Sequence, residues 1–268
     1  MLGLSINLFR VFGIRLAAHF TFPLLLAYAV WDGWRVGGWA GGAWSGVAVL
    51  LLFTCVVLHE LGHSLTAQRF GIRVSRILLL PIGGMAEFDT IPREPRRELL
   101  ITLAGPAVNF TIVLILLPWL PGSHLLAAGD VPLTPAALGF GPWFLNLIIS
   151  FNLVMGCFNL VPVFPMDGGR ILRALLAVRW PYLKATAWAS AIGKILAVVG
   201  AAYLGLVWHS FMGVLLFSFI FVAGDLEYRA VKRREDADAH WRLLLDRLYG
   251  SAGRPGSAAE ANLLHGPN

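Results

Sequence analysis

Long, nearly uninterrupted apolar segments constrain this chain more than any other feature of its sequence. A helix needs about 20 apolar residues to cross a bilayer, and six segments near that length run over about 16–31, 43–67, 99–120, 136–163, 186–206 and 209–226. Only 13% of the 268 residues are charged, whereas a soluble domain carries about a quarter. Ordinary soluble, disordered and fibrous classes are therefore excluded, and the sequence predicts a polytopic membrane protein.

The basic residues alternate from side to side across these segments. Two precede the first segment, six lie between the second and third, four lie between the fourth and fifth, and seven follow the sixth. Of the other two, Arg35 lies on the opposite side and Lys194 lies within the fifth segment. Because cytoplasmic loops are enriched in Lys and Arg, we predict a multi-pass protein of the inner or plasma membrane with both termini in the cytoplasm. The net charge of +6 then reflects topology, and we expect no nucleic-acid partner.

The sequence predicts an all-α polytopic membrane protein of about six transmembrane helices, with a small β-hairpin or sheet between helices two and three. Residues 1–226 would form the membrane domain, with an amphipathic leader before the first span. Two short β-like runs on either side of Gly83 and Gly84 predict the hairpin, over 74–88. Residues 227–250 would form a cytoplasmic amphipathic helix, and 251–268, rich in Gly, Ala, Ser and Pro, a disordered tail.

The second apolar segment contains the sequence His-Glu-Leu-Gly-His. Because residues four apart share one face of a helix, His59 and His63 can bind one metal ion, with Glu60 beside them as a general base. Two interior histidines with satisfied hydrogen bonds and a paired carboxylate would give the same short pattern. The depth of the motif favours the metal site, because ionisable groups inside a membrane are costly unless they serve a function.

A catalytic zinc ion needs three protein ligands and one open position, so a third ligand is expected elsewhere in the chain. At the end of the fourth segment, Pro162 and Pro165 should break the helix and leave Asp167 on unwound backbone. Such backbone is tolerated at depth only where it lines a cavity or the protein interior. The second and fourth segments run in the same direction, so both motifs can meet at a similar depth.

These motifs resemble those of the site-2 protease family of intramembrane zinc metalloproteases. The resemblance covers about residues 15–225 and rests on His-Glu-Leu-Gly-His, on the Asn-x-x-Pro-x-x-Pro-x-Asp-Gly-Gly pattern of 159–169, on the Gly-Gly hairpin, and on Ala-Gly-Pro-Ala-Val-Asn at 104–109. It implies one zinc ion held by His59, His63 and Asp167, with Glu60 catalytic. Some relatives add a PDZ domain or cystathionine-synthase-type repeats, and only about forty residues follow the sixth segment, so we expect the compact form.

The function expected from this resemblance is hydrolysis of peptide bonds within transmembrane segments. The partners would be the lipid bilayer and a membrane-spanning substrate, such as a tethered transcription regulator, an anti-sigma factor or a remnant signal peptide. Asn159 is a candidate for binding the substrate backbone or the oxyanion, although a packing hydrogen bond would explain it equally well. Asn109 is a weaker candidate for the same role, and Gly83 and Gly84 would belong to a substrate-binding hairpin.

A non-proteolytic metal-binding membrane protein, either a transporter or an inactive scaffold, is the alternative. Neither needs a general base, so the intact Glu60 favours the protease. A transporter should also place polar residues through both halves of the membrane, whereas the fifth and sixth segments look largely apolar on their outer side.

Overall fold

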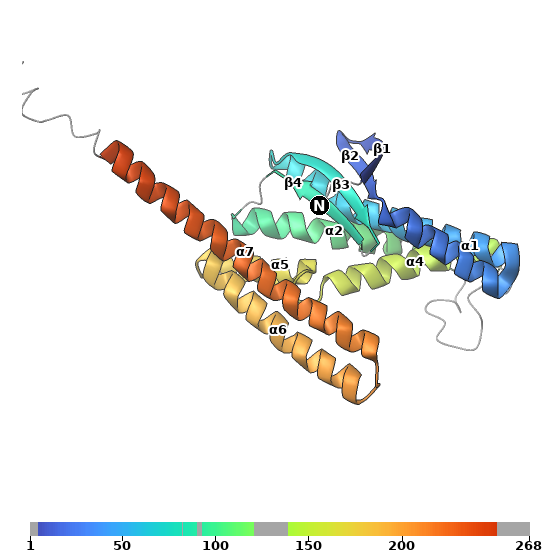
Figure 1. Ribbon diagram of the computed structural model, residues 1–268. Helices are drawn as coiled ribbons and strands as arrows, with labels where there is room; N and C mark the ends of the chain where they lie inside the picture. Colours follow the sequence, from blue (N-terminus) through green and yellow to red (C-terminus); the bar gives the residue numbers. More distant parts are fainter. Residues whose placement is uncertain (1–4, 82, 90–92, 121–138, 251–268) are drawn as a thin grey trace, which may run out of the picture.

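Helices make up most of the protein, and one small sheet lies beside them (Figure 1). The computed structural model describes residues 5–81, 83–89, 93–120 and 139–250. The elements in chain order are β1 (Ser5–Val11), β2 (Ile14–His19), α1 (Thr21–Arg69), β3 (Val74–Leu80), β4 (Gly83–Phe88), α2 (Pro95–Leu116), a 3₁₀ turn (Leu117–Trp119), α4 (Phe140–Asn159), α5 (Asp167–Ala177), α6 (Tyr182–Leu206) and α7 (Phe211–Gly250).

The second predicted span and most of the first lie within α1, which folds back on itself. Gly37 and Gly38 have non-helical backbone angles and separate two helical halves. The halves touch closely, because a Cβ atom at Gly33 would lie 2.5 Å from the carbonyl oxygen of Gly41. In the described residues, five helices are long and apolar enough to cross a membrane, and α1 is one of them. The prediction of a polytopic helical protein is confirmed, and the folded-back α1 reconciles these five helices with about six spans.

The N-terminal region differs from its prediction. The expected amphipathic leader forms the antiparallel strands β1 and β2, and β2 extends to His19, so the first helix begins at Thr21 instead of about residue 16. The physical reason is packing within the protein. Ile14 and Leu16 are buried in a core with Phe53 of α1, so they do not face lipid.

The predicted hairpin over 74–88 is confirmed as β3 and β4, and it is half of a larger sheet. The strand order is β1-β2-β3-β4, with β2 and β3 parallel and connected through α1. Strand β4 therefore forms one edge of the sheet and β1 the other. The buried face of the sheet packs on α1 and α2 through Ile77, Leu79, Leu61 and Ile101.

The helical structure is interrupted between α4 and α5, where Pro162 and Pro165 predicted the interruption. Helix α4 ends at Asn159, short of the predicted residue 163, and the chain turns through 160–166. Residues 136–138 of the predicted span lie outside the described residues. Asp167 does not lie on unwound backbone as predicted. It is the first residue of α5, because Met166 is extended and the helix starts directly after it.

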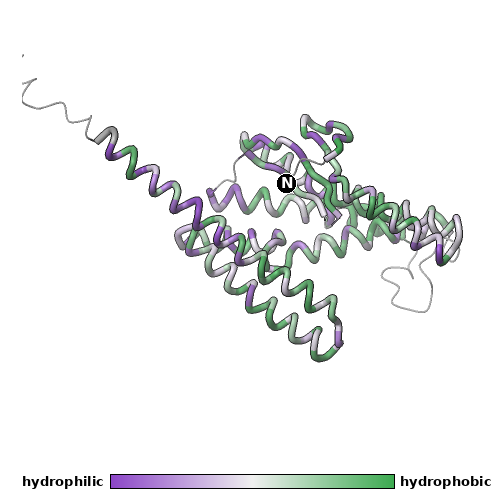
Figure 2. Tube along the Cα trace, in the orientation of Figure 1, coloured by the Kyte–Doolittle hydropathy of each residue, from purple (hydrophilic) through white to green (hydrophobic). Residues whose placement is uncertain are grey.

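Helices α6 and α7 lie side by side, and α7 extends well beyond the other helices (Figure 1). Lys194 of α6 donates to Asp225 of α7, so this intramembrane lysine has a carboxylate partner. Helix α7 is continuous to Gly250, without a break at 226, and Figure 2 shows its colouring change from mostly hydrophobic to mostly hydrophilic along its length. The tail predicted over 251–268 lies outside the described residues.

A buried ion-pair network joins four helices. Arg173 of α5, which is 1% exposed, donates to Glu98 of α2 and to Glu227 of α7. The hydroxyl of Tyr182, the first residue of α6, also donates to Glu98. Removing one partner of such a pair leaves an uncompensated buried charge, so the network fixes α5 against α2 and thereby positions Asp167.

Candidate metal centre

Three side chains converge inside the helical region, two from α1 and one from α5. The Nε2 atoms of His59 and His63 lie 3.1 Å apart. The Oδ2 atom of Asp167 lies 3.2 Å from the first and 3.1 Å from the second. All three residues are buried. The structure thus brings together the three residues that the sequence suggested as metal ligands.

The other ring nitrogen of each histidine faces an oxygen atom. His63 Nδ1 lies 2.8 Å from the carbonyl oxygen of Ile101, and His59 Nδ1 lies 2.6 Å from Oδ1 of Asn109. Because a carbonyl oxygen can only accept, each Nδ1 carries the proton and donates it. In a neutral imidazole the Nε2 atom is then an unprotonated acceptor.

The orientation of Asn109 is fixed by a chain of amide hydrogen bonds that starts at a backbone carbonyl. Asn152 donates from Nδ2 to the carbonyl oxygen of Ile148, at 2.9 Å. Its Oδ1 atom therefore faces Asn109 and accepts from Nδ2 of that residue, at 2.8 Å. This leaves Oδ1 of Asn109 to accept from His59. This series of hydrogen bonds connects α4, α2 and α1, and it determines which nitrogen of His59 faces the centre.

The donor set fits a zinc ion. With both imidazoles neutral, three acceptor atoms face one another, and Oδ2 of Asp167 is buried with no hydrogen-bond partner among the described residues. Burying such groups without compensation is costly. Zinc bonds of about 2.0 Å in a tetrahedral site place ligand atoms about 3.3 Å apart, close to the separations of 3.1 to 3.2 Å here.

Two glycines allow α1 and α2 to approach closely at this centre. A Cβ atom at Gly105 would lie 2.2 Å from Nε2 of His63 and 2.9 Å from Cε1 of His59. A Cβ atom at Gly62 would lie 2.6 Å from the carbonyl oxygen of Ala104. Only glycine fits at either position, so α2 covers one side of the site directly.

Asp167 is held in place by the two glycines that follow it. A Cβ atom at Gly168 would lie 2.1 Å from the carbonyl oxygen of Val161, and one at Gly169 would lie 2.7 Å from the backbone nitrogen of Phe164. The first turn of α5 therefore packs directly against the turn that leads into it. The tight turn places Asp167 next to the histidines of α1, although β3, β4, α2 and α4 separate α1 from α5 in the sequence.

Glu60 lies next to β4. A Cβ atom at Gly84 would lie 2.7 Å from Cγ of Glu60, so the strand passes directly over this side chain. Glu60 is half-buried, and within the described part of the chain its carboxylate has no hydrogen bond or ion pair. It is therefore available to a water molecule or a substrate.

The remaining predicted site residues occupy different places. Asn109 lies behind His59, with both ends of its amide in hydrogen bonds. Asn159, at the end of α4, donates to the carbonyl oxygen of Met155 at 3.1 Å, and its Oδ1 atom has no hydrogen bond within the described part of the chain. Gly83 and Gly84 begin β4 beside Glu60.

Sequence reasoning missed two residues of the site. Asn152 orients the ligand histidine through Asn109, but an asparagine within an apolar helix offers no sign of its partner. Gly105 covers the site, and the sequence shows it only as part of the Ala-Gly-Pro-Ala-Val-Asn motif at 104–109. Its proximity to two histidines from another helix has no local sequence signal.

Comparison with known proteins identifies a family that shares these motifs. The model of peptidase family M50 matches residues 47–132 and 134–200 of this chain. That range includes His59, His63 and Asp167.

Individual relatives are similar over most of the chain. A zinc metalloprotease of Methanocaldococcus jannaschii is 39% identical over 85% of this chain and 62% of its own length. Stage IV sporulation protein FB of Bacillus subtilis is 30% identical over 76% of this chain and 64% of its own length. The chain thus spans less than two thirds of either relative. The solved structure of a site-2 protease from Methanocaldococcus jannaschii is 38% identical, with a TM-score of 0.58, and the match covers 84% of this chain and 95% of that one.

We predict that Gly105→Ala removes metal binding. The added methyl group would overlap Nε2 of His63, which cannot move without leaving the site. Zinc content of the purified protein should fall well below that of the wild type. Gly141→Ala is the matched control, because a Cβ atom there would meet nothing within 4 Å. A Gly105→Ala protein that is folded by circular dichroism and holds normal zinc would contradict the prediction.

We predict that Asn109→Leu weakens zinc binding about 10- to 100-fold, the usual loss when a hydrogen-bond partner behind a ligand histidine is removed. Without Oδ1 of Asn109, the ring of His59 loses the contact that sets its orientation and its protonated nitrogen. Competition with a chelator measures the affinity. Asn159→Ala, which removes an amide bonded only to its own helix, should retain wild-type affinity.

Proposed function

The chain belongs to peptidase family M50, the site-2 protease family, and on this premise we propose that it is an intramembrane zinc endopeptidase. One observation carries the proposal: three buried acceptor atoms from His59, His63 and Asp167 converge on one point, with the unpaired carboxylate of Glu60 beside them. These residues lie in or next to helices that are long and apolar enough to span a membrane. The geometry therefore supports peptide hydrolysis within a multi-pass membrane protein.

In this proposal, His59, His63 and Asp167 hold one zinc ion. The bound ion would supply Lewis-acid chemistry, by lowering the pKa of water and polarising the scissile carbonyl. Glu60 takes the proton of the attacking water and returns it to the leaving amine nitrogen. Its half-buried position beside β4 leaves it exposed to a water molecule on one side.

Asn159 and Asn109 have separate roles in the proposal. The amide of Asn159 already donates one hydrogen bond to its own helix, and its second N–H remains to bind the substrate backbone or the oxyanion. Asn109 does not reach the substrate, because its amide is fully used between His59 and Asn152. Asn109 instead positions the metal-ligand histidine His59.

A transmembrane substrate must unwind before its carbonyl groups become accessible, because a helix satisfies all of them internally. The edge of a sheet provides new partners for an unwound strand. Strand β4 is such an edge, and Gly83 and Gly84 bring it next to Glu60. We infer that the unwound substrate adds to β4 and thereby lies across the metal centre.

The proposed substrates are single-span membrane proteins, such as tethered transcription regulators, anti-sigma factors or remnant signal peptides. The concentration of basic residues on one side of the predicted spans supports a cell-membrane protein with both termini in the cytoplasm. The metal centre would then lie toward the cytoplasmic ends of α1 and α4.

We predict that Glu60→Gln lowers cleavage about 10²- to 10⁴-fold, the usual contribution of a general base, while zinc content stays unchanged. The amide keeps the size of the side chain and removes only the ability to accept the proton. Co-expression with candidate single-span substrates, followed by immunoblotting for the shortened product, measures cleavage. Metal analysis of the same purified protein measures zinc.

The matched control is Glu94→Gln, which neutralises an exposed carboxylate on the same protein and should leave cleavage intact. Cleavage that persists with Glu60→Gln would refute the assigned mechanism. A wild-type protein that holds no zinc would refute the metalloprotease itself.

We predict that blocking the free edge of β4 reduces cleavage without unfolding the protein. Neighbouring residues of a strand point their N–H groups in opposite directions, so proline at Met85 and, separately, at Ala86 tests both directions. The variant whose lost N–H points away from β3 should remain folded and cleave poorly. Proline at Leu8 of β1, on the opposite edge, is the control. Normal cleavage by both β4 variants would exclude strand addition.

A further inference from the structure

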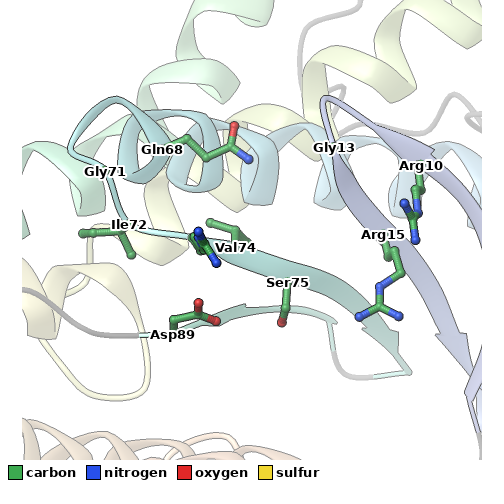
Figure 3. A pocket seen from close by; sticks show the side chains of 10 residues that line it. Arg10, Gly13, Arg15, Gln68, Gly71, Ile72, Val74, Ser75 and Asp89 are labelled. Atoms are coloured by element: carbon green, nitrogen blue, oxygen red, sulfur yellow. The ribbon is translucent and has the colours of Figure 1, made fainter.

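A basic pocket lies at the other end of the sheet from the metal centre. Its volume is about 610 Å³, within the range of small-molecule sites. The lining includes three arginines, Arg10, Arg15 and Arg73, and one carboxylate, Asp89. Figure 3 shows Arg10 and Arg15 on the two strands of the β1–β2 hairpin, with Asp89 across the opening. The pocket therefore carries a positive charge of two.

The arginines of this pocket form part of a row across the sheet. The strand register places Arg10 opposite Arg15, Arg15 opposite Arg76, and Arg76 opposite Glu87 on β4. Glu87 binds Arg76 through both carboxylate oxygens, at 2.7 and 2.8 Å, and this pairing holds the pKa of Glu87 below its usual range. The row thus contains three cations and a single anion, Glu87, which is hydrogen-bonded to Arg76 and also interacts electrostatically with Arg15.

Like charges placed directly opposite each other destabilise a sheet. Arg10 and Arg15 are such a pair, and neither has an ion pair within the described residues. An anion between the two guanidinium groups would remove this repulsion. Guanidinium groups match a phosphate especially well, because their parallel N–H groups donate to two of its oxygens.

The pocket lies where a membrane surface would meet the protein. Gln68, one residue before the end of α1, lines it and donates to the carbonyl oxygen of Phe12 at the tip of the β1–β2 hairpin. The hairpin presents large apolar side chains to its surroundings, with Phe12 69% and Phe9 58% exposed. Aromatic groups beside arginines are typical of the headgroup region of a bilayer.

We propose that this pocket binds the phosphate group of an acidic phospholipid, with Arg10 and Arg15 as the principal contacts and Arg73 as the third cation. The exposed phenylalanines of the hairpin favour a lipid over free phosphate, because they would lie among the acyl chains. The lipid would fix the β1–β2 hairpin to the membrane surface. This assignment does not depend on the proteolytic function, because β1 and β2 lie on the side of the sheet away from Glu60.

The test uses the full chain in a neutral detergent, with native mass spectrometry to count bound lipid. Dioleoyl phosphatidylglycerol should bind at one site, and dioleoyl phosphatidylcholine should not. The double variant Arg10→Gln, Arg15→Gln should bind phosphatidylglycerol about 30-fold more weakly, or about fivefold for each arginine. Arg96→Gln, Arg233→Gln, which removes two exposed charges outside the pocket, should bind like the wild type.

Thermal unfolding provides a second measurement that does not depend on counting lipids. Phosphatidylglycerol should raise the midpoint of the wild type and leave that of the double variant unchanged. Without lipid, the double variant should unfold at the same temperature as the wild type or higher, because it lacks two facing like charges.

Three outcomes would overturn the proposal. The double variant could retain wild-type affinity for phosphatidylglycerol. Millimolar inorganic phosphate could displace the lipid, which would make this a free phosphate site. An acidic peptide could bind in an Arg10- and Arg15-dependent manner where phosphatidylglycerol does not, which would assign the pocket to a protein segment.

Discussion

Two imidazole nitrogens and a carboxylate oxygen meet within 3.2 Å of one another inside the helical region, and all three are acceptors when the imidazoles are neutral. In a buried environment this arrangement repels itself unless a cation lies between the three atoms. Much of the fold around it serves to hold that geometry. Hydrogen bonds to Asn109, supported by Asn152, and to the carbonyl of Ile101 orient the two histidine rings. The Arg173–Glu98 ion pair holds α5 against α2.

Close approach of the helices depends on small residues rather than on apolar burial alone. Lipid tails are as apolar as leucine side chains, so helices in a membrane associate mainly through tight packing and hydrogen bonds. Gly62 and Gly105 bring α1 and α2 together at the ligands, and Gly168 seats α5 on the turn before it. Each of these glycines lies where a methyl group would collide with backbone or with a ligand ring.

The sheet connects the two proposed binding sites. Its β4 edge passes over Glu60, where we place the unwound substrate, and its β1–β2 side carries the unpaired arginines, where we place a lipid phosphate. The row from Arg10 to Glu87 crosses all four strands. A lipid that fixes the hairpin would therefore also fix the platform on which the substrate strand adds.

The sequence by itself determined the class of the protein and singled out the three residues of the proposed metal centre, which the structure brings together. The hydropathy of the segments and the side-to-side distribution of Lys and Arg are one-dimensional signals, and so is the i, i+4 spacing of His59 and His63. Pro162 and Pro165 likewise predicted the interruption between helices α4 and α5.

Only the tertiary structure decided what those residues touch. The β1–β2 hairpin was not predicted because the apolar side chains of β2 pack on α1, and the sequence does not show whether an apolar residue faces protein or lipid. The start of α5 at Asp167, the hydrogen bonds from Asn152 to His59, and the cover that Gly105 forms all join helices distant in sequence. Hydrogen bonds and close contacts between distant segments leave no periodic trace in a single chain, so the donors and acceptors could be counted from the sequence but not paired.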